Sequence, residues 1–249
     1  MTPERARKLL EDTGAIIDGH FVGTSGSHMS VYVAKDRATR FPSIASELCL
    51  GIAEMFATDD IEAVVGQGGC GTVLSQWTAH HLTLLRPDKP EVLALYSEHG
   101  ETVLYDYKND ISLITRPDFS DHGTIRKNDK LILRRADLIL KRGFEDDVRS
   151  KRVLVLEDVL TTGESAAKTI NAVVFAGGMV VGLGAIVNGG NFTTETFFPV
   201  LRPVLKSLVD LKRGVFTEKE CRVRGLCAGG VPVNTKFGHG QEFLARRNK

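Results

Sequence analysis

The sequence predicts an α/β fold with a mostly parallel central sheet flanked by helices. One observation is that short apolar segments, typical of buried parallel strands, alternate with segments of helical periodicity. A second is the stretch 153–165, where four apolar residues lead into Glu157 and Asp158 and then into a small, hydroxyl-rich turn that opens a helix. Ligands of open α/β sheets bind at such strand ends. At 249 residues, the chain is expected to form one large domain or a domain with appendages.

The N-terminal part of the chain predicts two helices with short strands between them. Residues 3–13 have the amphipathic pattern of a short helix that ends near Gly14. Over 15–36, small, polar and β-prone residues alternate around several glycines, which indicates short strands and a turn. Residues 42–57 carry apolar side chains at helical spacing and predict a longer helix.

The remaining predicted elements form a strand–helix alternation. A glycine-rich turn at 66–72 separates the first core strand from a helix that runs to about Leu85. Further strands are apolar and short, and a helix follows the third. The four predicted core strands are residues 61–66, 92–96, 151–157 and 179–187.

Composition excludes several classes of protein. A net charge of +1 offers no general attraction to nucleic acid or to anionic membranes, so a nucleic-acid partner is not expected. No apolar run reaches the roughly 18 residues of a membrane span, and the charged N-terminus does not resemble a signal peptide. Four scattered cysteines do not make a disulfide framework, and a reducing, cytoplasmic location is therefore predicted.

The segment between the second and third core strands is unusually long. Residues 99–142 show little helical periodicity, and seven Lys or Arg stand against two acids over 124–142. Loops of this length are usually functional or disordered. The segment has two interpretations, a solvated β-rich insertion or a cationic lid that closes over a pyrophosphate. Its candidate strands are Thr102–Tyr107, Ile111–Thr115 and Lys130–Leu133.

The stretch 153–165 predicts a site for a phosphorylated sugar. Its turn offers backbone N–H groups and the hydroxyls of Thr161, Thr162 and Ser165 to a phosphate at a helix N-terminus. Glu157 and Asp158 can accept hydrogen bonds from vicinal hydroxyls. The alternative is an ordinary strand–turn–helix with a solvated acidic pair.

This stretch resembles the phosphoribosyl-diphosphate (PRPP) motif of type I phosphoribosyltransferases, in which Glu-Asp is followed after two residues by Thr-Thr-Gly, one residue and Ser. Flanking segments resemble the orotate phosphoribosyltransferase family in particular, in matching order along most of the chain outside roughly 100–138. They are Thr13–Ile16, Gly19–Gly26, Tyr32-Val33, Lys35-Asp36, Leu140–Phe144, Cys221 and Cys227–Val233.

The resemblance implies a type I phosphoribosyltransferase fold with a hood formed by both ends of the chain. It implies a single domain with the hood at 1–40 and about 205–249, a core at about 41–98 and 141–204, and an insertion or lid at about 99–140. The activity implied is transfer of phosphoribosyl from PRPP to a pyrimidine-type base, orotate first. A homodimer is also implied.

The resemblance further assigns roles to individual residues. Glu157 and Asp158 would hold the ribose hydroxyls of PRPP, and Lys141 and Arg142 would reach its pyrophosphate. The 5-phosphate cradle would be Thr161, Thr162, Gly163, Glu164 and Ser165, and the pyrophosphate loop would include Gly66, Gln67, Gly68 and Gly69. The base pocket would include Ser25, Gly26, Tyr32, Val33 and Asn188. Mg²⁺ would be held mainly by PRPP, with Asp158 as the candidate protein ligand and no other metal held directly by the protein.

Two departures from the family pattern keep other functions open. Gly189 stands where family members commonly place an arginine that grips the orotate carboxylate, although Arg202 or an insertion residue is a candidate substitute. The second strand leads into Ser97-Glu98-His99 without a lysine or arginine, while His122 within the insertion is a weak counterpart of the family's loop histidine. The alternatives are transfer to another nucleobase and a non-catalytic PRPP-sensing regulator.

Cys221 and Cys227 lack a second cysteine pair. Zinc binding there would require further ligands, such as His239 or residues of a partner chain.

Overall fold

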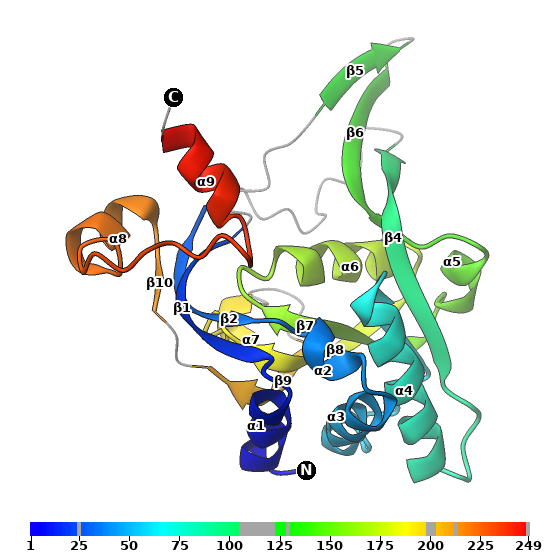
Figure 1. Ribbon diagram of the computed structural model, residues 1–249. Coiled ribbons are helices and arrows are strands. Elements are labelled where there is room, and N and C mark those ends of the chain that lie inside the picture. Colours follow the sequence, from blue (N-terminus) through cyan, green and yellow to red (C-terminus); the bar gives the residue numbers. More distant parts are fainter. Residues whose placement is uncertain (24–25, 105–122, 128–129, 198–202, 212–213, 248–249) are drawn as a thin grey trace.

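The computed structural model describes residues 1–23, 26–104, 123–127, 130–197, 203–211 and 214–247, with side-chain detail outside 101–137. Its centre is a seven-stranded sheet with strand order β5-β6-β4-β3-β7-β8-β9 (Figure 1). Neighbouring strands pair in parallel along β4-β3-β7-β8-β9, whereas β6 pairs antiparallel with both β4 and β5. The strands are β3 (Ala63–Gln67), β4 (Leu93–Leu104), β5 (Gly123–Lys127), β6 (Lys130–Ile139), β7 (Arg152–Leu160), β8 (Met179–Asn188) and β9 (Val204–Asp210).

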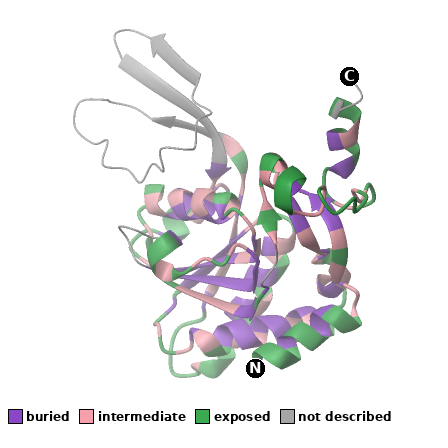
Figure 2. Cartoon of the chain, turned by 90° about the vertical axis from the view of Figure 1, so that its left-hand side faces the viewer, coloured by how far each residue is buried: buried purple, intermediate pink, exposed green. Residues whose placement is uncertain are grey.

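Helices cover both faces of the sheet because the central strands are apolar on both sides. Along β7, Leu154 and Leu156 belong to the hydrophobic core beneath α1, α3 and α4, whereas Val153 and Val155 belong to the core beneath α6. This alternation follows from the two-residue period of a strand. Buried residues accordingly line the sheet and the inner sides of these helices (Figure 2). The helices are α1 (Pro3–Asp12), α3 (Pro42–Met55), α4 (Cys70–Leu85) and α6 (Glu164–Phe175), with short helices α2 (Asp36–Thr39), α5 (Phe144–Asp147) and α7 (Thr194–Phe197).

A second, three-stranded sheet brings the two ends of the chain together and forms the hood. Its order is β1-β2-β10, and both pairings are antiparallel. Helices α8 and α9 pack against β10 and β1, respectively. Figure 1 shows this unit to one side of the central sheet. Its elements are β1 (Ile16–Val22), β2 (His28–Val33), β10 (Val215–Phe216), α8 (Glu218–Arg224) and α9 (Gly240–Arg247).

The predicted helices and core strands are present with bounds shifted by a few residues. The sequence did not indicate β9, which pairs in parallel with β8, so the predicted hood boundary near 205 falls inside a strand of the central sheet. The predicted start of the insertion at 99 falls inside β4, which continues without a break from Leu93 to Leu104. Of the candidate insertion strands, the one over 111–115 lies outside the described residues.

None of the helices in the described part of the chain is both long enough and apolar enough to span a membrane.

Candidate functional site

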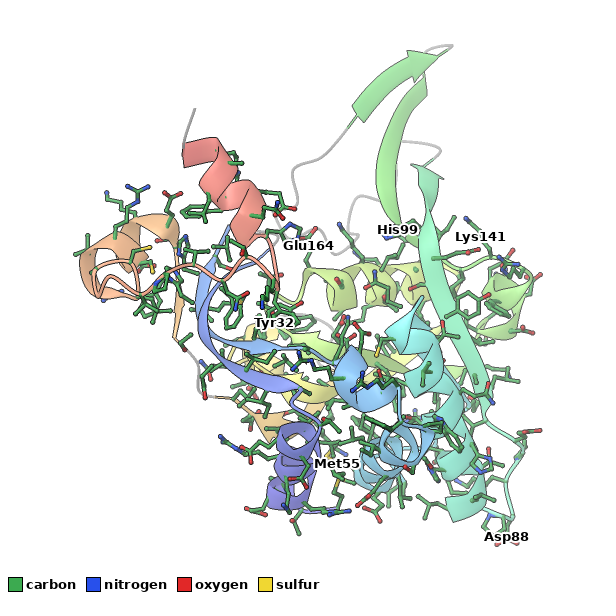
Figure 3. All side chains as sticks on the ribbon, in the orientation of Figure 1. Tyr32, Met55, Asp88, His99, Lys141 and Glu164 are labelled. Carbon is green, nitrogen blue, oxygen red and sulfur yellow. The ribbon has the colours of Figure 1, made fainter. Side chains whose placement is uncertain are left out.

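A cleft of about 570 Å³ lies at the carboxyl end of β7, where the hood meets the central sheet. Its floor is the segment from Glu157 to Ser165, and the hood contributes Tyr32 and Val33. In Figure 3, Tyr32 of the hood, Glu164 at the start of α6 and His99 of β4 border this region. The cleft thus lies at the strand end where the sequence predicts a ligand site.

Asp158 is buried in the cleft and forms an ion pair with Lys35. Its Oδ1 atom also accepts a hydrogen bond of 2.6 Å from the backbone N–H of Val159, which fixes the carboxylate. Burial opposes the charge on Lys35, but attraction to Asp158, the hydrogen bond between them and the nearby Cys70 and Glu157 leave the pKa of Lys35 raised. Burial, with the charge of Asp158, raises the pKa of the nearby Cys70 thiol to about 12.

The surroundings of Glu157 favour its protonated form. Burial, followed by the charge of Asp158 and a hydrogen bond to it, raises the pKa of Glu157 well above its ordinary value of 4.5. Its Oε2 atom is buried and has no hydrogen-bond partner among the described residues. A buried, unsatisfied carboxyl oxygen facing a cleft is costly, and a ligand hydroxyl would satisfy it.

The raised pKa of Glu157 predicts a specific pH dependence of stability. The folded state keeps the proton while the unfolded state loses it above pH 4.5, so this contribution falls as pH rises from there through the folded-state pKa. The Glu157→Gln protein should lose less stability across this range than the wild type. Urea unfolding at a series of pH values measures the difference, and parallel curves for the two proteins would contradict it.

The turn between β7 and α6 has the form of a phosphate cradle. Gly163, with φ of 74°, caps α6 in the left-handed conformation, and a side chain there would overlap the Phe197 ring. The hydroxyl of Thr162 accepts a weak hydrogen bond of 3.4 Å from the backbone of Glu164. Thr161 and Ser165 line the same cleft. The N-terminus of α6 thus faces the cleft together with three hydroxyl side chains, an arrangement that favours an anion.

The glycine-rich loop after β3 is defined by a close backbone approach. A Cβ at Gly66 would overlap the carbonyl oxygen of Gly71 and lie 2.8 Å from its Cα atom. Gly69 has a φ of 82°, which also favours glycine. The N–H of Gly68 donates to the Ser97 carbonyl over 2.8 Å and so anchors the loop to β4. Of the four residues predicted to contact pyrophosphate here, Gln67 lines the cleft.

Lys141 and Arg142 are not among the cleft-lining residues. Both form long ion pairs with Glu98, and Lys141 donates to the His99 carbonyl over 3.0 Å. In Figure 3, Lys141 lies toward α5. Lys141 is thus held beside His99, which lines the cleft, but does not line the cleft itself. Its contact with pyrophosphate stays a prediction and would require the Lys141 side chain to move.

The predicted base-binding residues are divided. Tyr32 and Val33 line the cleft. Gly26 does not line it, and Ser25 lies outside the described residues. Asn188 is buried with both ends of its amide bonded to the backbone of Phe192, at 2.9 and 3.1 Å. The Asn188 side chain therefore closes the turn after β8. Its amide already bonds to the Phe192 backbone, so the predicted contact with a base would require these hydrogen bonds to break.

The structure adds cleft residues that were not predicted as site residues. Cations or titratable groups come from Lys35, Lys168, His99 and His239. Lys168 lies one helical turn after Glu164 and pairs with it at 2.6 Å. The four-residue spacing from Glu164 could have placed Lys168 at the cleft from sequence alone. Lys35 and His239 reach the cleft only because the hood folds over the sheet.

Comparison with known proteins gives a consistent family likeness. No family model matches the chain. The orotate phosphoribosyltransferase of Caldicellulosiruptor bescii is 25% identical over 226 residues, which cover 91% of this chain and 92% of the relative. That of Thermotoga maritima is 27% identical over 234 residues, covering 94% and 98%, respectively.

Solved structures identify the fold. The orotate phosphoribosyltransferase of Mycobacterium tuberculosis in complex with inorganic phosphate superposes with a TM-score of 0.51 at 22% identity, covering 84% of this chain and 96% of that chain. A phosphoribosyltransferase from Corynebacterium diphtheriae reaches 0.54 at 18% identity, with coverages of 84% and 96%. The fold is that of type I phosphoribosyltransferases, as predicted, and over most of its length the chain is similar to proteins named orotate phosphoribosyltransferase.

Proposed function

We propose that this chain is an enzyme that transfers the 5-phosphoribosyl group from PRPP to orotate and releases orotidine 5'-monophosphate and pyrophosphate. The observation that carries the proposal is the acidic pair Glu157 and Asp158 beside the phosphate cradle at 161–165, in one cleft. Similarity over most of the chain to proteins named orotate phosphoribosyltransferase supports orotate as the base.

The cleft residues divide the substrate between them. The N-terminus of α6 and the hydroxyls of Thr161, Thr162 and Ser165 bind the 5-phosphate. Glu157 and Asp158 hold the ribose hydroxyls, which satisfies the unpartnered Oε2 atom of Glu157. As the C1–O bond lengthens, positive charge develops on the ribose, and the acidic pair stabilises that charge through the hydroxyls.

Lys35 has a second role in this scheme. In this structure its ammonium group pairs with Asp158. A sugar hydroxyl that bonds to Asp158 would free Lys35 to bind an anionic oxygen of the substrate. Lys35 would then contribute positive charge as pyrophosphate leaves.

Mg²⁺ fits the donors available at this site. Asp158 supplies a carboxylate oxygen in the cleft, and Mg²⁺ prefers such oxygen ligands together with substrate phosphates. When bound, Mg²⁺ neutralises charge on the leaving pyrophosphate.

The base lies between the hood and the acidic pair, against Tyr32 and Val33. An orotate carboxylate needs a cationic partner, which Gly189 does not supply. Among the described residues lining the cleft, Lys35, Lys168, His99 and His239 are the candidates, while Arg202 lies outside the described part of the chain. A homodimer and a cytoplasmic location are further parts of this proposal, and sedimentation analysis tests the first.

The proposal is tested by incubating the purified protein with PRPP, MgCl₂ and orotate and identifying the products by chromatography. Orotidine 5'-monophosphate and pyrophosphate in equal amounts support it. Their absence under conditions where PRPP binds would contradict it.

A PRPP-sensing regulator is the second candidate, favoured by Gly189 and by the absence of a lysine or arginine in Ser97-Glu98-His99. Calorimetry with PRPP and a pyrophosphate-release assay together separate the two functions. A sensor would bind PRPP but release no pyrophosphate with any base.

A further inference from the structure

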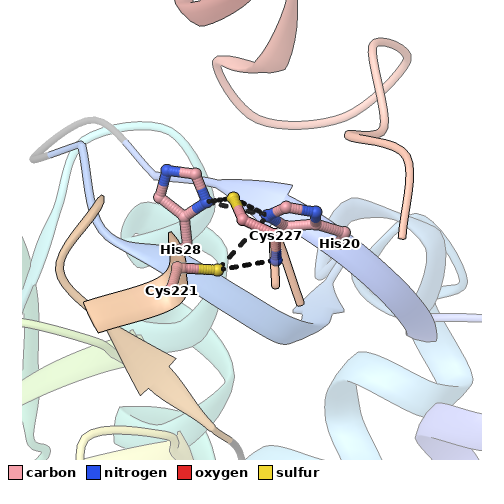
Figure 4. A group of neighbouring side chains, drawn as sticks. All are labelled: His20, His28, Cys221 and Cys227. Atoms are coloured by element: carbon pink, nitrogen blue, oxygen red, sulfur yellow. Dashed lines mark hydrogen bonds between the residues drawn. The ribbon is translucent and has the colours of Figure 1, made fainter. Parts of the chain in front are cut away.

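Four potential metal ligands converge in the hood, away from the acidic pair. His20 comes from β1, His28 from β2, Cys221 from α8 and Cys227 from the segment just after α8. One ligand atom from each lies within 4.8 Å of the ligand atoms of the other three. Figure 4 shows the four side chains pointing toward one another. The two histidines and the two cysteines are about 200 residues apart in sequence, so folding itself assembles the group.

We propose that this cluster is a structural zinc site. Zinc bound at 2.0–2.1 Å to nitrogen and 2.3 Å to sulfur separates tetrahedral ligands by about 3.3 Å for two nitrogens and about 3.6 Å for nitrogen and sulfur. The His20 Nε2 atom lies 3.7 Å from both sulfur atoms, and the Nδ1 atom of His28 lies 3.5 Å from the sulfur of Cys227. The two nitrogens are 2.7 Å apart and would separate by about 0.6 Å on binding.

Hydrogen bonds around the cluster prepare His20 and Cys221 as ligands. The Nδ1 atom of His20 lies 2.7 Å from the Val231 carbonyl oxygen, which is an acceptor, so the proton is on Nδ1 and the lone pair of Nε2 faces the cluster. Metal-bound histidines characteristically donate their other ring N–H to such an acceptor. The backbone N–H of Cys227 donates to the sulfur of Cys221 over 3.2 Å, a contact that stabilises a thiolate.

Burial and ligand type favour zinc in a structural role. His20, His28 and Cys221 are 1%, 0% and 0% exposed, and both cysteines carry thiols rather than a disulfide. Two sulfur and two imidazole ligands suit Zn²⁺, and four protein ligands leave no open position for a substrate. In this proposal His20 and His28 take the place that the sequence suggested for His239 or a partner chain, and the protein itself would hold the metal.

The site connects the hood to the cleft. Beyond Cys227, the chain returns along β1, where the N–H of Asn234 donates to the His20 carbonyl and that of His239 donates to the Val22 carbonyl, at 2.7 and 2.8 Å. Gly238 and His239 then line the cleft. Zinc would therefore fix the C-terminal segment against β1 and β2 and hold this wall of the cleft in place.

The first test is the metal content of tag-free protein, measured by elemental mass spectrometry after growth with added zinc. We expect one zinc per chain, and a cobalt-substituted protein should show the absorption bands of tetrahedral cobalt with thiolate ligands. Chelation should lower the melting temperature. Protein that carries no zinc and gives no such cobalt spectrum would overturn the proposal, as would a Cys221–Cys227 disulfide found by intact-mass analysis.

Variants locate the site. Cys221→Ser and His28→Asn should each weaken zinc binding by at least roughly 10- to 100-fold, which is the loss that follows when a residue hydrogen-bonded to a metal ligand is changed. The matched controls are Cys49→Ala, a buried cysteine of α3, and His80→Asn, an exposed histidine of α4. Both should retain one zinc. Equal zinc retention in all four variants would place the metal elsewhere. The wild-type cobalt spectrum decides the matter even where a variant fails to fold.

Discussion

The Asp158→Asn protein should fold normally and lose about 10²- to 10³-fold in kcat/KM, the effect of removing one preorganised charge contact from a transition state. Asparagine keeps the shape of the side chain but removes the charge that pairs with Lys35 and that, in the proposed function, stabilises the developing positive charge on the ribose. Steady-state kinetics with PRPP and orotate measures the loss, and circular dichroism checks the fold.

Asp146→Asn is the matched control for that substitution. Asp146 lies on α5, where its exposed side chain pairs with Arg149, and it does not line the cleft. The control protein should keep wild-type kinetics, because an exposed ion pair contributes little to stability. Full activity in Asp158→Asn would rule out the role assigned to the acidic pair.

Gly66→Ala should have the largest effect on the loop after β3. The added methyl group would overlap the backbone of Gly71, which cannot rotate away as a side chain could. Overpacking of this kind costs about 1–3 kcal/mol of unfolding free energy. In a chain of this size, each kcal/mol lowers the melting temperature by about 2–4 °C. Because the loop must shift, the affinity for PRPP should also fall.

Gly229→Ala is the control for the loop substitution. Gly229 lies in the exposed segment after α8, and the nearest atom to an added Cβ would be 3.7 Å away, an ordinary contact distance. Its stability should remain within about 0.5 kcal/mol of the wild type. Thermal unfolding and PRPP calorimetry on both variants make the comparison. A Gly66→Ala protein as stable as Gly229→Ala would show that the loop tolerates a side chain.

Local sequence was sufficient to predict the strand, turn and helix that form the floor of the cleft. The run from Val153 to Ser165 carries strand, acids, turn and helix start in one continuous segment, so its geometry depends little on the rest of the fold. The parallel sheet followed from the same kind of local pattern.

Residues brought together by the hood were beyond local reasoning. Lys35 reaches Asp158 across more than a hundred residues, and the His20 and Cys221 pairing spans two hundred. Asn188 shows the opposite limit. Its position at the end of β8 suggested a base contact, but the sequence does not reveal that the backbone of Phe192 engages its amide. Such outcomes depend on tertiary packing, which a motif does not encode.

The most direct test of the proposed function is the rate of pyrophosphate release from PRPP and Mg²⁺ with orotate, uracil, hypoxanthine, adenine and nicotinate as separate acceptors. We expect kcat/KM for orotate to exceed that for every other base. This result would mean that a cationic side chain elsewhere binds the orotate carboxylate in place of an arginine at position 189. Faster release with a different base, or none with any base despite PRPP binding, would contradict the assignment to orotate.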